Sequence, residues 1–372
     1  TPSPTRIPRI AWLGGDGIGP EVLDATRSVL DSIGFRAEYI PADIGWKFWC
    51  EEGNPLPERT LDVLRSTNCA MFGAITSKPA SDAARELAQP LRSRNLKYAS
   101  PIVQLRRQFN LFANIRPAQT FAPSDRPLNV IVVRENTEGL YSGLEIHPTP
   151  QSLVAALDPD RRLPHLRETD PSDLALSVRV TTRAGTERII RRALELARSL
   201  NRKRVTLVEK ANVLRATGGL TTEVARTIAT AFPEIQFREA HIDTACMDLV
   251  RRPSEFDVIV AENLFGDILS DLTAGLSGGP GLAPSANIGD TYAVFEPVHG
   301  SAPDIAGKST ANPCAAFLSA SMMLDWLGER QLAQRLHSAV RTVLTEARTK
   351  TPDLGGSATT KQMASAIIAA AK

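Results

Sequence analysis

The stretch RIAWLGGDGIGPEVLDATRSVLDSI, residues 9–33, begins with a strand, continues through a glycine-rich turn and ends in a helix. The apolar run in RIAWLG indicates the strand, and the helix is expected from about Pro20 to Ile33. The glycines of GGDGIG do not have the G-x-G-x-x-G spacing of a dinucleotide-binding turn. A tight turn between strand and helix explains them equally well, so this segment predicts an α/β unit and no pyrophosphate site.

The same order of strand and helix continues along the chain. Runs rich in β-branched and aromatic residues predict further strands, namely FRAEYI, CAMFGAI, NVIVVREN, RVTLVEKAN and FDVIVAEN. The segment TERIIRRALELARSL, residues 186–200, has apolar residues at helical spacing and arginines on the other face. This alternation predicts a layered α/β fold with parallel strands.

Two polar segments interrupt this pattern. Residues 76–101 are polar and basic, and we expect them to form a long loop with a helical piece. Residues 147–173 are rich in proline and in charges of both signs. We expect them to form an exposed excursion from the body of the protein.

The composition limits the classes of function that fit the chain. Its 372 residues, 42% of them hydrophobic, can bury a sizeable core in two domains or one large α/β unit. The net charge of +2 gives no support for a nucleic acid or a membrane surface as partner. The four cysteines are scattered without a CxxC pair, and the first residues hold no long apolar run. We therefore expect a cytoplasmic protein with reduced thiols, without a signal peptide or a spanning helix.

The stretch ENLFGDILSDLTAGL, residues 262–276, is mostly apolar and yet carries two acids, Asp267 and Asp271. Four residues apart, they share one helix face, where like charges repel each other. A solvated acidic face is the alternative, and the apolar neighbours of the two acids weaken it. Asp243 is a third acid, which follows a predicted strand, and oxygen ligands without Cys or His suit Mg²⁺ or Mn²⁺. The pattern predicts a metal site on this helix.

Five other polar residues are candidates for substrate binding or catalysis. Arg106, Arg116 and Arg134 are expected near strand ends, where they form either surface salt bridges or forks for a substrate with several carboxylates. Lys210 ends an apolar strand and is either a desolvated base or a lysine that reaches solvent, which its position slightly favours. Tyr141 stands beside ENTEG, and a lone tyrosine is more often a packing residue than an acid. The residue types alone leave these alternatives open.

The segment FEPVHGSAPDIAGKSTANP, residues 295–313, is dense in Gly, Pro and small residues. It also carries His299, Asp304 and Asn312. Such a composition predicts a ligand-binding loop between a strand and a helix. By itself, His299 would more often be a hydrogen-bonded core histidine.

Several motifs together resemble those of the β-decarboxylating dehydrogenases, a family that includes isocitrate, homoisocitrate, 3-isopropylmalate and tartrate dehydrogenases. They occur here in the family's order: GDGIGPEV, LFANIRP, VRENTEGLYSG, KANVL, GDILSDLTAGL and EPVHGSAPDIAGK…ANP. The resemblance spans nearly the whole chain and is nearest to homoisocitrate dehydrogenase, on the segments GWKFWCEEGNPLP, SPIVQLRR and TPDLGGSATT. YSGLE and HIDTACMDLV are as similar to NAD-dependent isocitrate enzymes.

This resemblance implies the two-domain α/β fold of isopropylmalate and isocitrate dehydrogenases, which is not a Rossmann fold. A large cofactor-binding domain would combine residues 1–111 with residues 278–372. Residues 112–277 would form a small domain with the dimer interface and the metal ligands. The chain would act as a homodimer or a dimer of dimers with shared active sites, in which Lys210 and Asp243 enter the site of the neighbouring subunit.

The resemblance also implies a reaction in which NAD oxidises a 2-hydroxy acid and the β-carboxylate then leaves as CO₂. Asp243, Asp267 and Asp271 match the ligands of the family's Mg²⁺ or Mn²⁺ ion. Lys210 matches the base that takes the hydroxyl proton, and Tyr141 matches the acid that protonates the carbon left by CO₂. The residues at substrate-binding positions are Ser100, Ile102, Val103, Arg106, Arg116, Arg134 and Asn212. Those at cofactor-binding positions are His299, Gly300, Ala302, Asp304, Ile305 and Asn312.

Two of these positions bear on the choice of cofactor and substrate. A carboxylate at Asp304 matches the members that use NAD, because it accepts the ribose hydroxyls and repels the extra phosphate of NADP. Ile102 and Val103 place an apolar wall beside the hydroxyl of Ser100, which favours homoisocitrate over isocitrate. Isocitrate and 3-isopropylmalate remain alternative substrates.

Two alternatives to this interpretation remain. The segment RSRNLK adds Arg92, Arg94 and Lys97, which are either solvated surface charges or a site for an extra anion, even a phosphonate in a specialised pathway. The other alternative is a non-catalytic regulatory subunit of the same fold. Such a subunit would be expected to lose the base, the acid or a metal ligand, whereas this chain has all of them. We therefore favour an enzyme.

Overall fold

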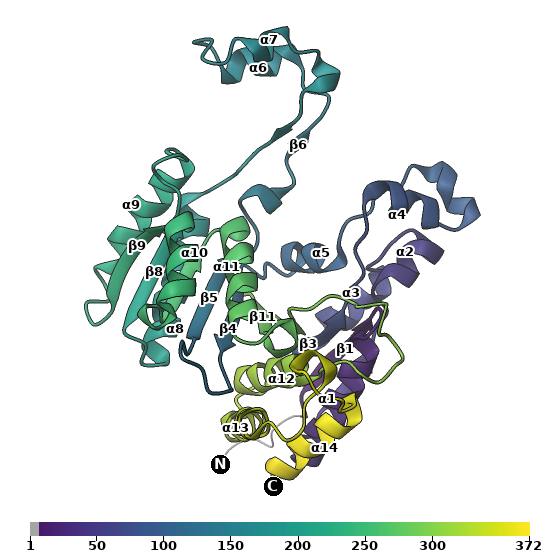
Figure 1. Ribbon diagram of the computed structural model, residues 1–372. Coiled ribbons are helices and arrows are strands. Elements are labelled where there is room, and N and C mark those ends of the chain that lie inside the picture. Colours follow the sequence, from purple (N-terminus) through teal and green to yellow (C-terminus); the bar gives the residue numbers. More distant parts are fainter. Residues whose placement is uncertain (1–6) are drawn as a thin grey trace.

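The computed structural model describes residues 7–372, which form one large sheet with helices on both faces (Figure 1). The order of its strands is β2-β1-β3-β12-β11-β4-β5-β10-β8-β9. They are β1 (Arg9–Gly15), β2 (Glu38–Pro41), β3 (Cys69–Ala74), β4 (Ala113–Gln119), β5 (Asn129–Glu135), β8 (Arg204–Glu209), β9 (Gln236–His241), β10 (Val258–Ala261), β11 (Pro284–Ile288) and β12 (Ala293–Pro297).

The central strands are buried on both faces, which explains their nearly continuous apolar sequences. In β1 and β3, Ile10 and Met71 belong to the core on one face of the sheet, while Ala11 and Phe72 belong to the core on the other. All six residues of β3 are buried. The sheet therefore needs a layer of helices on each side.

Two groups of helices supply these layers. One face carries α1 (Gly19–Ser32), α8 (Arg183–Ser199), α9 (Thr217–Ala229), α12 (Cys314–Trp326), α13 (Arg330–Glu346) and α14 (Thr360–Ala370). The other face carries α3 (Glu58–Arg65), α5 (Pro101–Gln108), α10 (Ile242–Arg251) and α11 (Asn263–Leu276). In Figure 1 the C-terminal α14 lies beside α1, and the two helices are in contact.

The sheet divides into two halves. Strands from residues 9–111 and 278–372 make up the half from β2 to β11, and strands from residues 112–277 make up the half from β4 to β9. The halves meet where β11 pairs with β4, at Ala286–Ile115, Asn287–Asn114 and Ile288–Ala113. The division into two domains with these boundaries stays a prediction.

The expectation of parallel strands throughout was wrong in the centre of the sheet. β11 runs antiparallel to both of its neighbours, and β4 runs antiparallel to β5. The reason is that β4 is joined to β5, and β11 to β12, by a short connection without a helix, and such connections make antiparallel pairs. The remaining strand pairs of the ten-stranded sheet are parallel.

The predicted helices are present with small shifts at their ends. α1 begins at Gly19, one residue before the expected start, and has Pro20 in its first turn. α8 begins at Arg183, earlier than the apolar pattern indicated, because the Thr182 side chain accepts a hydrogen bond from the Gly185 N–H and caps the helix.

Both polar segments leave the body of the protein. Residues 76–101 contain α4 (Ala80–Glu86) and the 3₁₀ helix η1 (Gln89–Arg94), and they pack on α2 (Trp46–Glu52) through Trp49 and Tyr98. The segment from β6 (Glu145–Ile146) to β7 (Leu176–Ser177) projects as an arm that carries α6 (Gln151–Leu157) and α7 (His165–Glu168) (Figure 1). We call residues 145–177 the arm.

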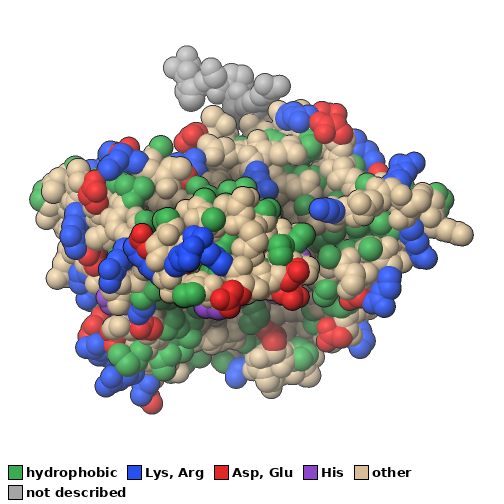
Figure 2. All heavy atoms as spheres, turned by 90° about the horizontal axis from the view of Figure 1, so that it is seen from above, with side chains coloured by type: hydrophobic (Ala, Val, Ile, Leu, Met, Phe, Trp, Pro, Cys, Tyr) green, Lys and Arg blue, Asp and Glu red, His purple; other side chains and the backbone are tan. Residues whose placement is uncertain are grey.

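The surface has no dominant charge. Acidic and basic side chains are interspersed over the face seen in Figure 2, which agrees with the small net charge. Within residues 7–372, none of the helices combines the length and the apolar character that crossing a membrane requires.

Candidate active site

A cavity of about 320 Å³ lies where the two halves of the sheet meet. Both halves contribute to its walls, because α5 and the segment after β12 come from one half and β4, β5 and α11 come from the other. The predicted site residues that line it are Ser100, Ile102, Val103, Arg106, Arg116, Arg134, Tyr141, Asp267, His299 and Gly300. The structure thus gathers residues from five separate segments of the chain in one place.

Three buried guanidinium groups dominate this cavity. Arg106 comes from α5, Arg116 from β4 and Arg134 from β5, and their exposed fractions are 6%, 8% and 1%. Burial, reinforced by Arg106 and Arg116, lowers the pKa of Arg134 to about 10. Because that value is still well above neutral pH, three positive charges crowd one wall of the cavity. Such a wall attracts a ligand with several negative charges.

Asp267 of α11 is the acid that faces these arginines. It pairs with Nη1 of Arg134, and its Oδ1 lies 3.3 Å from Nη1 of Arg116. Its Oδ2 accepts a hydrogen bond of 2.5 Å from the Tyr141 hydroxyl. Two guanidinium groups and a phenol therefore converge on one carboxylate inside the cavity.

Tyr141 lies in a short 3₁₀ helix, η2 (Leu140–Ser142), with its ring 4.9 Å from the Arg134 guanidinium. Burial, and after it the hydrogen bond to Asp267, raises the pKa of the Tyr141 hydroxyl above its usual value. The phenol therefore keeps its proton at neutral pH. A protonated hydroxyl inside a substrate cavity is suited to act as a proton donor.

The acids predicted to hold a metal occupy two places. Asp267 and Asp271 are one turn apart on α11, and Oδ1 of Asp271 lies 3.5 Å from Nη1 of Arg116. Asp243 lies in the first turn of α10 and forms an ion pair of 2.7 Å with Nζ of Lys210. Within residues 7–372, no three acidic, Cys or His side chains lie close enough together to hold a metal ion. Asp267 and Asp271 suit Mg²⁺ or Mn²⁺ by their oxygen chemistry, but one chain supplies only these two ligands.

Lys210, Asn212 and Asp243 lie outside the cavity of their own chain. Lys210 follows β8, Asn212 is exposed on the same loop, and the side chain of Asp243 is 66% exposed. That these three residues complete the site of a neighbouring subunit stays a prediction.

The predicted cofactor loop, residues 299–312, is held tightly at its start. The Ile18 N–H donates to the Ser301 carbonyl at 2.9 Å, and the hydroxyls of Ser301 and Thr76 are 2.7 Å apart. At Gly17, φ is +57° and a Cβ atom would come within 1.9 Å of the Ser301 carbonyl oxygen. The glycine-rich turn therefore supports this loop by close backbone contact.

Two observations show that the loop can accept a ligand. Nε2 of His299 is buried without a hydrogen-bond partner among the described residues, and burial lowers the pKa of this imidazole. At the other end of the loop, Asn312 donates to Asp353 at 2.9 Å, and a Cβ atom at Gly281 would lie 2.6 Å from Asp353. Asp304 is exposed, and Ile305 is half-buried between the two ends. The unsatisfied imidazole fits a ligand that offers it a hydrogen bond. The backbone beside it is open, because within 4 Å a Cβ atom at Gly300 would meet only the Ile75 carbonyl oxygen, at 3.9 Å, among the described residues.

Sequence reasoning missed two residues of this region. Glu296 lines the cavity, is buried, and lies 3.5 Å from Nη2 of Arg106. The available signal was a lone acid in AVFEP, the otherwise apolar β12 strand. Asp353 gave no comparable signal, because it lies far from Asn312 in the sequence.

The basic residues Arg92, Arg94 and Lys97 are exposed and do not line the cavity. Nε of Arg92 donates to the Leu87 carbonyl at 2.8 Å, so this side chain is engaged within its own segment. Their placement favours the interpretation as surface charges.

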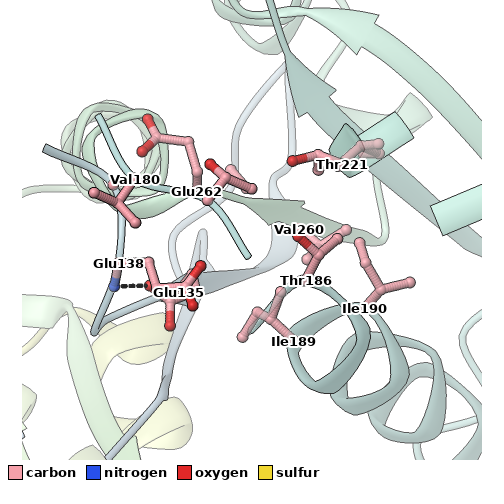
Figure 3. A pocket seen from close by; sticks show the side chains of 13 residues that line it. Glu135, Glu138, Val180, Thr186, Ile189, Ile190, Thr221, Val260 and Glu262 are labelled. Carbon is pink, nitrogen blue, oxygen red and sulfur yellow. Dashed lines mark hydrogen bonds between the residues drawn. The ribbon is translucent and has the colours of Figure 1, made fainter. Parts of the chain in front are cut away.

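Figure 3 shows a second hollow, lined by Glu135, Glu138 and Glu262 together with Ile189 and Ile190 of α8. Its solvent volume of about 20 Å³ has room for about one water molecule. Glu135 accepts a hydrogen bond of 2.6 Å from the Glu138 N–H, drawn as a dashed line, and Glu262 caps α11 through the Phe265 N–H. These acids serve the local structure, and the hollow is too small for a substrate.

Comparison with known proteins places this arrangement among enzymes. The profile of a family described as isocitrate/isopropylmalate dehydrogenase matches residues 9–367. The isocitrate/homoisocitrate dehydrogenase of Thermus thermophilus is 44% identical over 98% of this chain and 98% of its own length. Protein DlpA of Legionella pneumophila is 42% identical over 97% of this chain. That relative is longer, and the match covers 58% of its length.

A solved structure is similar over the same range. The crystal structure of isocitrate dehydrogenase from Methylococcus capsulatus superposes with a TM-score of 0.85, at 41% identity, over 98% of this chain and 99% of that one. This similarity confirms the predicted fold class and the predicted family resemblance.

Proposed function

Because the chain belongs to the isocitrate/isopropylmalate dehydrogenase family, whose members are decarboxylating dehydrogenases of hydroxy acids, we propose that it acts on a 3-substituted malate. The reaction would use NAD and Mg²⁺ or Mn²⁺ and would yield a 2-oxo acid and CO₂. The observation that carries this proposal is the convergence of Arg106, Arg116 and Arg134 on one cavity with Tyr141 and Asp267. Three guanidinium groups there match a substrate that carries several carboxylates.

The residues of the chain have distinct roles in this proposal. Lys210 takes the proton of the substrate hydroxyl while a hydride leaves the same carbon for the nicotinamide of NAD. The bond to the β-carboxylate then breaks, CO₂ leaves, and Tyr141 gives a proton to the carbon that carried it. A bound Mg²⁺ or Mn²⁺ would supply Lewis-acid chemistry at the oxygens of the substrate. Asp267 and Asp271 would hold the ion, with Asp243 as the third ligand.

We further propose that the active unit is a homodimer or a dimer of dimers. Lys210 and Asp243 form a pair outside the cavity of their own chain, so this cavity lacks a base and a third metal ligand. α10 packs beside α11. Both helices carry exposed apolar side chains, which are Met247 and Val250 on α10 and Ile268 and Leu276 on α11. A second copy that covered this face would bury them and complete both sites.

Mixing two inactive variants tests this shared site. Lys210→Ala and Asp267→Asn should each be inactive alone. When they are produced together, each mixed dimer has one of its two sites with both native residues, so purified mixed dimers should have about half of the wild-type activity. The measurement is NADH formation by mixed dimers that are purified with two different tags. If each chain holds a complete site, the mixture will stay inactive.

The preferred substrate is proposed to be homoisocitrate. Ile102 and Val103 line the cavity beside Ser100 and offer an apolar wall to a longer substituent. The similarity to an isocitrate/homoisocitrate dehydrogenase supports this substrate and keeps isocitrate as an alternative.

The test is NADH formation with Mg²⁺ on homoisocitrate, isocitrate, 3-isopropylmalate, tartrate and a phosphonate-bearing malate, compared by kcat/KM. We expect the highest value for homoisocitrate, and higher values with NAD than with NADP because Asp304 repels the extra phosphate. A preference for the phosphonate-bearing malate would assign the enzyme to a specialised pathway. Absence of turnover with all five would favour a regulatory subunit.

The basic segment gives a separate prediction. Replacing Arg92, Arg94 and Lys97 together by alanine should leave the KM for every carboxylate substrate within about twofold, because exposed charges outside the cavity are screened by salt. The measurement is KM at low and at physiological ionic strength. A rise of KM of tenfold or more would place these residues at the site.

A further inference from the structure

Behind the three cavity arginines lie three asparagines, and none of them is exposed to solvent. The Nε atom of each arginine donates to the amide oxygen of one of them. The pairs are Arg106 with Asn287 at 2.9 Å, Arg116 with Asn114 at 2.5 Å, and Arg134 with Asn263 at 2.9 Å. The same contact thus recurs at three arginines that come from three different elements.

The orientation of these amides is determined by their other contacts. A guanidinium group only donates hydrogen bonds, so the amide atom that faces it must be the oxygen. Oδ1 of Asn287 also accepts from Asn114 at 2.8 Å, and its Nδ2 donates to Glu296 at 2.7 Å. Nδ2 of Asn263 donates to the Glu138 carbonyl at 3.2 Å. The three amides are therefore fixed by a connected buried network.

Several other arginines of the chain are held by carboxylates. The largely buried Arg179 pairs with Glu209 at 2.6 Å, and the exposed Arg59 pairs with Glu52 at 2.6 Å. A carboxylate would hold the Nε side of the cavity arginines equally well as a hydrogen-bond acceptor. It would also cancel the positive charge, whereas an amide oxygen orients the guanidinium group and leaves its charge intact.

We propose that Asn114, Asn263 and Asn287 are positioning residues that orient the cavity arginines without neutralising them. Asp267 and Glu296 already lie beside the Nη atoms of these guanidinium groups. An amide at each Nε atom adds no further negative charge, so the positive charge that remains is available for the carboxylates of a bound polyanion. This inference rests on the proposed function in one respect, since it takes the arginine cavity to be the site of an anionic substrate.

The test replaces an amide by a carboxylate of the same shape. Asn263→Asp and Asn114→Asp should each weaken the binding of tricarballylate, an inert tricarboxylate without a hydroxyl group, by at least about tenfold. The thermal midpoint should fall, because a carboxylate cannot make the hydrogen bonds that Nδ2 of Asn114 and of Asn263 donates. Asn263→Leu and Asn114→Leu lose the same bonds without adding a charge, and they are measured beside the Asp variants. Binding is measured by calorimetry on the full chain without NAD or metal. The buffer is passed over chelating resin, because a soluble polycarboxylate chelator would compete for the site.

Asn129→Asp is the matched control. Oδ1 of Asn129 accepts a hydrogen bond of 2.6 Å from Arg202 at an exposed position outside the cavity, so this variant should bind tricarballylate like the wild type. A purely structural role of the buried asparagines would lower the affinity of the Leu and the Asp variants equally.

Three results would overturn the proposal. They are wild-type protein that does not bind tricarballylate, a folded Asp variant that binds within twofold of wild type, and loss of folding in both Asp variants. Because the readout is binding and not turnover, it is separate from the proposed function. A chain that oxidises none of the candidate hydroxy acids, but loses the anion in the Asp variants, would refute the function and leave this inference standing.

Discussion

Lys210→Ala is expected to lower kcat for oxidation by about 10²–10⁴-fold, the usual contribution of a positioned general base. Lys210 pairs with Asp243 at 2.7 Å, and its side chain is only 23% exposed. The ammonium group of this pair has no free lone pair, so Lys210 can take the substrate's proton only after it has lost its own. In the proposed dimer that would become possible because Asp243 would hold the metal ion instead of the lysine. The KM for NAD should change little, because residues 299–312 lie in the other half of the sheet.

The measurement is steady-state NADH formation, with added methylamine to replace the missing amine. A rise of activity with methylamine concentration would support a base, since a merely structural lysine would not be rescued. Lys203→Ala is the control, because Lys203 is exposed just before β8 and its Nζ binds only the neighbouring Asn201 side chain at 2.7 Å. Activity of Lys210→Ala within twofold of wild type would refute the assignment.

Arg134→Lys is expected to lower kcat/KM by about 10²–10⁴-fold, although the charge is kept. Loss of one partner of a buried, hydrogen-bonded charge pair costs about 2–5 kcal/mol of binding free energy, and the upper part of this range corresponds to such a factor. The Arg134 guanidinium is 1% exposed, donates to Asn263 through Nε and Nη2, and pairs with Asp267 through Nη1. A lysine ammonium cannot reproduce this fork.

The measurement is kcat/KM for the best substrate, together with the thermal midpoint. Arg202→Lys is the control, because Arg202 also donates to an asparagine oxygen, at Asn129, but lies outside the cavity. If Arg134→Lys retained wild-type kcat/KM, the guanidinium fork would not be needed for substrate binding. The anion site would then have to be assigned to Arg106 and Arg116.

The sequence predicted those parts of the fold in which burial and apolar pattern coincide. α1 and β3 have the expected residues because their buried side chains mainly pack against the core. β4 was missed as a strand because Asn114 and Arg116 interrupt its apolar pattern. Both side chains are buried, and Arg116 lines the cavity while Asn114 accepts a hydrogen bond from it, so the same residues that serve the site conceal the strand.

The same reasoning applies to the site. Charged residues such as Arg106, Arg134 and Asp267 could be found from the sequence, because an isolated charge in an apolar segment has to be explained. Neutral amides such as Asn263 and Asn287 give no such signal, and their role depends on contacts between distant segments. The pairing of Asn312 with Asp353 was beyond sequence reasoning for the same cause.

The position of β12 in the sheet has a consequence for synthesis of the chain on the ribosome. β3 is buried along its whole length between β1 and β12, yet β12 is made long after β3 has left the ribosome. During that interval the nascent chain presents an apolar strand with one unpaired edge, which is a surface that chaperones and aggregating neighbours recognise. The half from β4 to β9 is complete before β12 appears, so we expect it to fold first and the half that contains both chain ends to close last.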